Sequence, residues 1–143
     1  QGPVRDVTVM GENKSSLGPA IAAMLKPDGI RLSPDEHPEA GYFYRSDHFS
    51  FARVGIPSTT IAAGTDFVGK PAGWGKAQAD EYVAKRYHQP SDEFNPSWPL
   101  TGTAQIASIA YRFGTRLANA ATIPTWNKDA EFRAIREKSM SSR

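Results

Sequence analysis

The spacing of hydrophobic positions changes several times along the chain, and each spacing predicts a different element. In residues 4–11, apolar side chains are interleaved with charged or hydroxyl side chains, which predicts a strand closed by Gly11. In residues 17–26, apolar side chains recur every three or four positions, which predicts a helix. The same reasoning predicts strands at 30–32 and 56–62 and helices at 78–86, 100–121 and 126–138.

This order of elements predicts an α/β fold, a partial mixed sheet with helices packed on it. About three strands are few for an independent sheet. We therefore expect residues 1–143 to form part of a single domain whose N-terminal part is absent. The chain opens on Gln1 with no basic and apolar leader, so we also expect that it was cut from a longer protein.

Composition and charge narrow the classes of partner. The chain is 39% hydrophobic and 22% charged with a net charge of +2, which is ordinary for a globular protein. The basic residues are scattered, so we expect no nucleic-acid partner. No apolar run is long enough to predict a membrane span. The absence of cysteine excludes disulfides and thiolate zinc ligands.

Residues 41–57 concentrate the candidate chemistry of the chain: three aromatic side chains, an Arg, a Ser, an Asp and a His lie within its first eight positions. Ser46 or Asp47 is placed to cap a helix that Gly55 would end. Phe51 and Val54 would then face the core. Polar side chains at the start of a helix often lie at the mouth of a pocket.

Asp47 and His48 are neighbours in sequence, so their side chains must diverge. We expect one of them to face a site and the other to face the fold, and a packed His48 is the structural alternative. Ser46 lacks the turn motif of serine hydrolases. A triad of Ser46, His88 and Asp47 has no supporting context.

His88 is the strongest candidate metal ligand. It lies in a turn after a predicted helix, next to Pro90, and neutral imidazole is a good zinc ligand. The alternative is an exposed or structural turn histidine. His37, in a loop rich in Pro and acidic residues, is expected to be exposed. The Gly-rich loop at 64–75 is either functional or a surface crossover.

Several motifs taken together resemble a known family. They are residues 44–57 (YRSDHFSFARVGIP), 64–66 (GTD), 69–71 (GKP), 73–76 (GWGK) and 87–94 (YHQPSDEF). This combination resembles the C-terminal part of bacterial co-catalytic zinc aminopeptidases. The same metallopeptidase family contains glutaminyl cyclase and the transferrin-receptor-like domains. The resemblance covers nearly the whole chain and implies the C-terminal portion of a zinc-exopeptidase-like (phosphorylase/hydrolase-like) fold.

The resemblance also implies roles for individual residues. Enzymes of this kind bind two zinc ions, and His88 is similar to their last His ligand. Tyr44 or Tyr42 would donate a hydrogen bond to the tetrahedral intermediate, and spacing does not decide between them. Asp47 would hold the metal ligands in position without contacting the metal itself. On this resemblance we expect Tyr44 and Asp47 to be catalytic, Tyr42, Arg45 and His48 to bind substrate, and His88 to be the metal ligand.

The remaining ligands of the family precede this region. The chain contains no Glu-Glu pair, and a catalytic zinc uses three protein ligands. The resemblance therefore implies a parent zinc aminopeptidase, hydrolysing N-terminal peptide bonds by metal-activated water. In this chain we expect zinc to be unbound or weakly bound, and the isolated chain to be inactive.

Two other functions stay open: a catalytically dead peptidase-like binding or scaffold domain, and acyl transfer of the glutaminyl-cyclase type. The expected partners are a peptide substrate for the parent and the N-terminal part of the same domain. An exposed sheet edge would also favour self-association into a homo-oligomer. The resemblance implies a periplasmic or secreted location.

Overall fold

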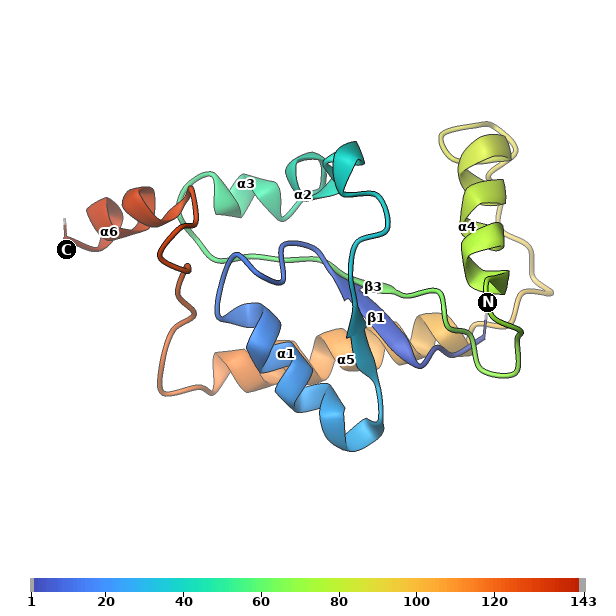
Figure 1. Ribbon diagram of the computed structural model, residues 1–143, viewed down its shortest axis with the longest axis horizontal. Coiled ribbons are helices and arrows are strands. Elements are labelled where there is room, and N and C mark those ends of the chain that lie inside the picture. The colour runs from blue at the N-terminus through green and yellow to red at the C-terminus, as the bar shows by residue number, and fades with distance from the viewer. Residues whose placement is uncertain (1, 142–143) are drawn as a thin grey trace.

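The chain forms a three-stranded mixed sheet with helices packed on it. The computed structural model describes residues 2–141 (Figure 1). β1 (Asp6–Val9) is central, β2 (Arg31–Ser33) runs parallel to it on one side, and β3 (Ile61–Ala63) runs antiparallel on the other. The helices are α1 (Leu17–Leu25), α2 (Tyr42–Arg45), α3 (Phe49–Ala52), α4 (Trp74–Lys85), α5 (Thr101–Ala118) and α6 (Arg133–Ser141), with short 3-10 turns at Lys26–Asp28 and Pro38–Ala40. The predicted α/β class with a partial mixed sheet is confirmed.

One face of the sheet carries the main core. Val7 and Val9 share that face because side chains alternate along a strand, and both are buried. They belong to one apolar cluster with Leu17, Ile21, Met24 and Leu25 of α1 and with Ile109 and Phe113 of α5. The helical stripes predicted from the sequence therefore form the core. Burial of this apolar surface is the main term that holds α1 and α5 to the sheet.

α5 is amphipathic, with one buried face and one exposed face. It spans Thr101–Ala118, within the predicted 100–121. Ile109 and Phe113 are buried, whereas Tyr111 between them is 75% exposed. None of the helices within residues 2–141 combines the length and the hydropathy that crossing a membrane requires.

Asp6, which points away from Val7, is a buried carboxylate that organises the loop after β3. It is 2% exposed. Its oxygens accept hydrogen bonds from the Ser33 hydroxyl and from the backbone amides of Thr65 at 3.3 Å and Asp66 at 2.9 Å. Gly64 permits this approach, because a Cβ there would lie 2.3 Å from the carboxylate. A buried charge satisfied in this way fixes the start of the loop at 64–75.

The strand predicted at 56–62 is wrong over most of its length, because only its last two positions belong to β3. Pro57 has no amide hydrogen to donate to a neighbouring strand. The Ser58 hydroxyl donates at 2.8 Å to the carbonyl of His48. The segment is thus tied to the candidate site by side-chain hydrogen bonds and does not extend the sheet.

Two helices begin at other positions than the pattern predicts. α4 begins at Trp74, four residues before the predicted start, because Gly73 adopts φ +80° and turns the chain into the helix. α6 begins at Arg133 and not at Trp126. Trp126 and Phe132 are buried in the non-helical segment before it. The two aromatic side chains that the sequence places in the predicted helix 126–138 therefore anchor a coil.

Candidate active site

Residues 42–52 form two one-turn helices, not the single capped helix that the sequence predicts. Ser46 separates α2 from α3 with an extended backbone, and its hydroxyl donates at 2.8 Å to the carbonyl of Tyr42. No side chain caps α3, so the predicted capping by Ser46 or Asp47 is wrong. Phe51 and Val54 are 57% and 52% exposed, so their predicted inward placement is also wrong.

Asp47 and His48 diverge as predicted: Asp47 is exposed and His48 is 7% exposed. The His48 Nδ1 lies 2.8 Å from the Thr60 hydroxyl, and its ring meets the Phe43 ring edge-on at 4.7 Å. Within the described part of the chain, Nε2 has no hydrogen-bond partner. Burial lowers the pKa of His48 below its usual value, and the Asp47 charge offsets only part of that shift. His48 is therefore a packed, mostly neutral imidazole.

The Tyr44 hydroxyl is held by two side chains that sequence reasoning did not single out. It donates at 2.7 Å to Glu131 Oε1 and lies 3.2 Å from the Lys14 ammonium. Lys14 also pairs with Glu131 at 3.0 Å. The hydrogen bonds from Tyr44 and Lys14 lower the pKa of Glu131. By contrast, the Tyr42 hydroxyl has no hydrogen bond within residues 2–141, and Tyr42 is half-buried.

Arg45 is exposed, and its guanidinium donates a long hydrogen bond of 3.4 Å to the carbonyl of Ala40. This contact leaves most of the guanidinium facing solvent. Arg45 and Asp47 are therefore the charged side chains that residues 42–48 present outward.

A segment near the C-terminus fixes the whole block. The Trp126 indole donates at 2.9 Å to the carbonyl of Gly55, and Phe132 stacks on Phe43 at 5.9 Å. Gly55 has φ +87°, and a Cβ there would lie 2.7 Å from the backbone nitrogen of Arg136. Phe43, Ala52, Trp126 and Phe132 form a second apolar cluster. The candidate site therefore stands on a core of its own, separate from the core under β1.

His88 lies in a different environment. It is exposed, has φ +58° and stacks on the Tyr87 ring at 3.9 Å. The turn after it is held by the Tyr82 hydroxyl, which donates at 2.7 Å to Asp92. This hydrogen bond raises the pKa of Tyr82. Asp92 thus orients the turn that follows His88.

The structure brings residues 42–48 together but does not join His88 to them. Figure 1 shows α4, which leads to His88, on the opposite side of the molecule from α3. No hydrogen bond, ion pair or ring contact links His88 to residues 42–48 in the described part of the chain. Within residues 2–141, no three His, Asp or Glu side chains lie close enough to hold a metal ion. These residues alone do not fit a zinc site, and the common cleft stays a prediction.

His37 behaves as its loop composition predicts. Its side chain is 46% exposed and lies 3.1 Å from Glu39. The hydrogen bond with His37 contributes to a lowered pKa of Glu39, after the larger contribution of a backbone hydrogen bond. His37 is thus a solvent-facing histidine outside both candidate stretches.

Comparison with known proteins places the chain in a family. The sequence model of the family described as Peptidase family M28 matches residues 1–112. The matched range contains both candidate stretches and ends within α5, so it leaves out Trp126, Glu131 and Phe132. No curated protein and no solved structure matches the chain. On the match over residues 1–112, the chain belongs to Peptidase family M28, a family of metallopeptidases.

Proposed function

We propose that the chain is the C-terminal part of the catalytic domain of a zinc aminopeptidase that hydrolyses N-terminal peptide bonds. The observation that carries this proposal is the family match, which spans both the 41–57 stretch and the His88 turn. In this reading His88 supplies one ligand to zinc. Its exposed ring and left-handed backbone are compatible with a ligand presented from a turn.

The other zinc ligands would come from the N-terminal part of the same domain. A catalytic zinc needs three protein ligands, and the described residues offer no group of three. We therefore propose that the chain alone binds zinc weakly at most and is inactive.

Residues 42–48 would form the substrate side of the site. Tyr44 and Asp47 are proposed as catalytic, and Tyr42, Arg45 and His48 as substrate-binding. The exposed side chains of Asp47 and Arg45 can pair with charged groups of a peptide. The buried His48 holds this segment in place through its hydrogen bond with Thr60. The contact of Tyr44 with Glu131 fixes its hydroxyl, which supports a role that requires a defined position.

The sheet supports the proposed partners. In the described residues, β2 and β3 each pair with β1 and with no further strand, so each presents an open edge. We propose that strands of the N-terminal part cover these edges, and that the chain self-associates through them when that part is absent. A periplasmic or secreted location is proposed from the family resemblance alone.

The activity test compares the chain alone with the chain joined to the residues encoded before Gln1. Both are incubated with Zn²⁺ and leucine p-nitroanilide. We expect hydrolysis from the joined protein only. His88→Gln in the joined protein should lower kcat/KM by more than about 100-fold, since even groups that merely support ligands are worth about 10–100-fold. His37→Gln is the matched control, and it should leave activity unchanged.

Each other outcome favours a different reading. Turnover by the chain alone would overturn the proposed inactivity. A joined protein that folds, binds peptide and hydrolyses nothing would favour the non-enzymatic binding domain. Cyclisation of peptides with N-terminal Gln, in place of hydrolysis, would favour the glutaminyl-cyclase type. Full activity of His88→Gln would remove His88 from the metal site.

A further inference from the structure

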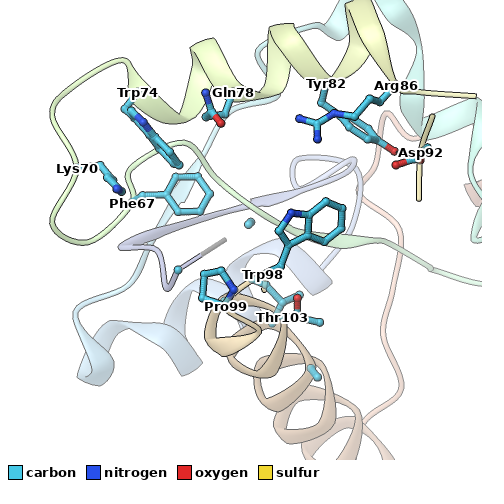
Figure 2. A pocket seen from close by; sticks show the side chains of 15 residues that line it. Phe67, Lys70, Trp74, Gln78, Tyr82, Arg86, Asp92, Trp98, Pro99 and Thr103 are labelled. Carbon is cyan, nitrogen blue, oxygen red and sulfur yellow. Dashed lines mark hydrogen bonds between the residues drawn. The ribbon is translucent and has the colours of Figure 1, made fainter. Parts of the chain in front are cut away.

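A cavity of about 980 Å³ lies between α4 and the start of α5. Figure 2 shows it from close by. Its volume is within the range of small-molecule pockets, roughly 300–1,000 Å³. None of the six residues assigned to the proposed active site lines it. The cavity is therefore a separate site, although Tyr82 and Asp92, which hold the turn after His88, belong to its lining.

Aromatic rings form its walls. Phe67 and Trp74, both from the Gly-rich stretch at 64–75, meet edge to face at 5.3 Å between ring centres. Trp98, which is 39% exposed, faces them from the segment before α5 (Figure 2). The cavity favours a functional role for the Gly-rich loop over a surface crossover. A flat apolar group bound between these rings would remove their surfaces from water.

The cavity also contains unbalanced positive charge. Lys70 places its ammonium 4.9 Å from the centre of the Trp74 ring. Arg86 extends into the cavity from the end of α4, and its guanidinium has no hydrogen bond or ion pair within the described residues. The carboxylate at this cavity, Asp92, is engaged by the Tyr82 hydroxyl at 2.7 Å. The charge that such a lining would attract is negative.

The polar side chains and the rings have a regular arrangement. Trp74, Gln78 and Tyr82 occur at intervals of four residues on α4, and Arg86 follows its last residue; all four line the cavity (Figure 2). The Arg86 side chain runs back along the helix toward Gln78 (Figure 2), so a small ligand with its ring in the space between Trp74 and Trp98 can turn its other end to the guanidinium. Arg86 can hold a carboxylate with two parallel hydrogen bonds.

We propose that this cavity binds a ligand that joins an aromatic ring to a carboxylate. The ring lies between Trp74 and Trp98, and the carboxylate pairs with Arg86. Gln78, which has no side-chain hydrogen bond in the described residues, donates a further hydrogen bond from its amide. A ligand with an amine in place of the carboxylate meets Lys70 and Arg86 and is repelled. A neutral amide keeps the ring contacts and loses the ion pair.

The test titrates the full chain, with EDTA present, against 3-phenylpropionate, 3-phenylpropanamide and 2-phenylethylamine. Binding is followed by tryptophan fluorescence and by calorimetry. We expect the carboxylate to bind about tenfold more tightly than the amide, which is the scale of one charge-assisted hydrogen bond. The amine should not bind. EDTA keeps the result independent of zinc, so failure here leaves the proposed peptidase function untouched.

Three variants sharpen the test. Arg86→Gln should remove the preference for the carboxylate over the amide and leave amide binding unchanged. Arg116→Gln, an exposed change in the last turn of α5, is the matched control and should keep the preference. Trp98→Leu should weaken the carboxylate and the amide equally. Circular dichroism checks that each variant is folded.

The outcomes decide between occupants. Equal binding of carboxylate and amide, or a preference that survives Arg86→Gln, would overturn the proposal. A fluorescence change that depends on protein concentration alone would show that a second copy of the chain fills the cavity, which would also overturn it. Loss of the preference in Arg86→Gln but not in Arg116→Gln would support it.

Discussion

The two stretches that carry the family resemblance are held in very different ways. Residues 42–55 rest on a buried cluster that includes Trp126 and Phe132, each 6% exposed. The segment after α4 rests on no such cluster in the described residues: Phe94 is 65% exposed, and hydrogen bonds hold the turn after His88. Besides the bond from Tyr82 to Asp92, the Ser91 hydroxyl donates at 3.1 Å to the carbonyl of Lys85 and the Asp92 amide donates at 3.0 Å to the carbonyl of Gln89. Within the described residues, the 42–55 block is therefore held by a buried core, and the segment after α4 is exposed to solvent.

This difference teaches where the chain needs a partner. Buried aromatic contacts with Trp126 and Phe132 of the same chain order the 42–55 block. The His88 turn buries too little apolar surface to be ordered equally well, so a contact from elsewhere is needed to fix it. We expect stability to depend on the first stretch and not on the second.

The largest effect is expected when the cluster under the 42–55 block is opened. Phe132→Ala removes a buried ring that stacks on Phe43 and contacts Trp126 at 5.0 Å between ring centres. We expect a loss of about 3–5 kcal/mol in the free energy of unfolding. Urea unfolding, followed by fluorescence, measures it.

Phe94→Ala is the matched control for that change. It removes the same side chain from the exposed segment after α4, and surface changes of this kind usually stay within about 0.5 kcal/mol. Equal losses for the two variants would show that the two stretches are held alike, and the contrast between them would fail.

A smaller effect should separate the histidines by pH. The folded pKa of His48 is lowered by burial, so the unfolded chain binds more protons between that value and the usual one near 6.5. Stability should therefore be unaffected by His48 above about pH 6.5 and fall as the pH drops below it. His48→Gln should remove this part of the pH dependence, as measured by thermal unfolding from pH 8 to pH 5.

His88→Gln tests the other side of the comparison. His88 is exposed, so its replacement should leave the free energy of unfolding at pH 8 within about 0.5 kcal/mol of that of the unmodified chain. A larger loss in His88→Gln than in His48→Gln would contradict the contrast between the two stretches.

The smallest effect is expected from Tyr82→Phe. This variant removes the hydroxyl that donates to Asp92 and keeps the ring. We expect faster amide hydrogen exchange at residues 88–93 and no measurable change in global unfolding. Exchange is followed by mass spectrometry, with Tyr111→Phe as a control because Tyr111 is exposed on α5. Unchanged exchange at 88–93 would mean that other contacts hold the turn.

Local patterns predicted the helices of the main core well. Leu17 and Ile21 lie four residues apart in α1, and Ile109 and Phe113 lie four residues apart in α5. All four are buried. Such spacing reports burial directly, because one face of a helix meets the sheet. The divergence of Asp47 and His48 was likewise predictable, since it follows from their adjacency alone.

Long-range contacts were not predictable in this way. The partner of Tyr44 is Glu131, 87 positions away, and nothing in the spacing of either residue indicates the other. Trp126 and Phe132 are large apolar side chains, so their burial could be expected. The spacing placed them in a helix, but that helix begins only at Arg133. Phe51 and Val54 fit a helical face and nevertheless point to solvent, because the helix they imply ends after one turn.

The second apolar cluster has a consequence for dividing the polypeptide. The family match stops at residue 112, whereas Phe113 of the main core and Trp126 and Phe132 of the second cluster lie beyond it. A chain shortened to the matched range would uncover Phe43 and lose the indole bond to Gly55. The limit of the shared sequence and the limit of the cooperative unit are therefore different places, and the second lies at least twenty residues further on.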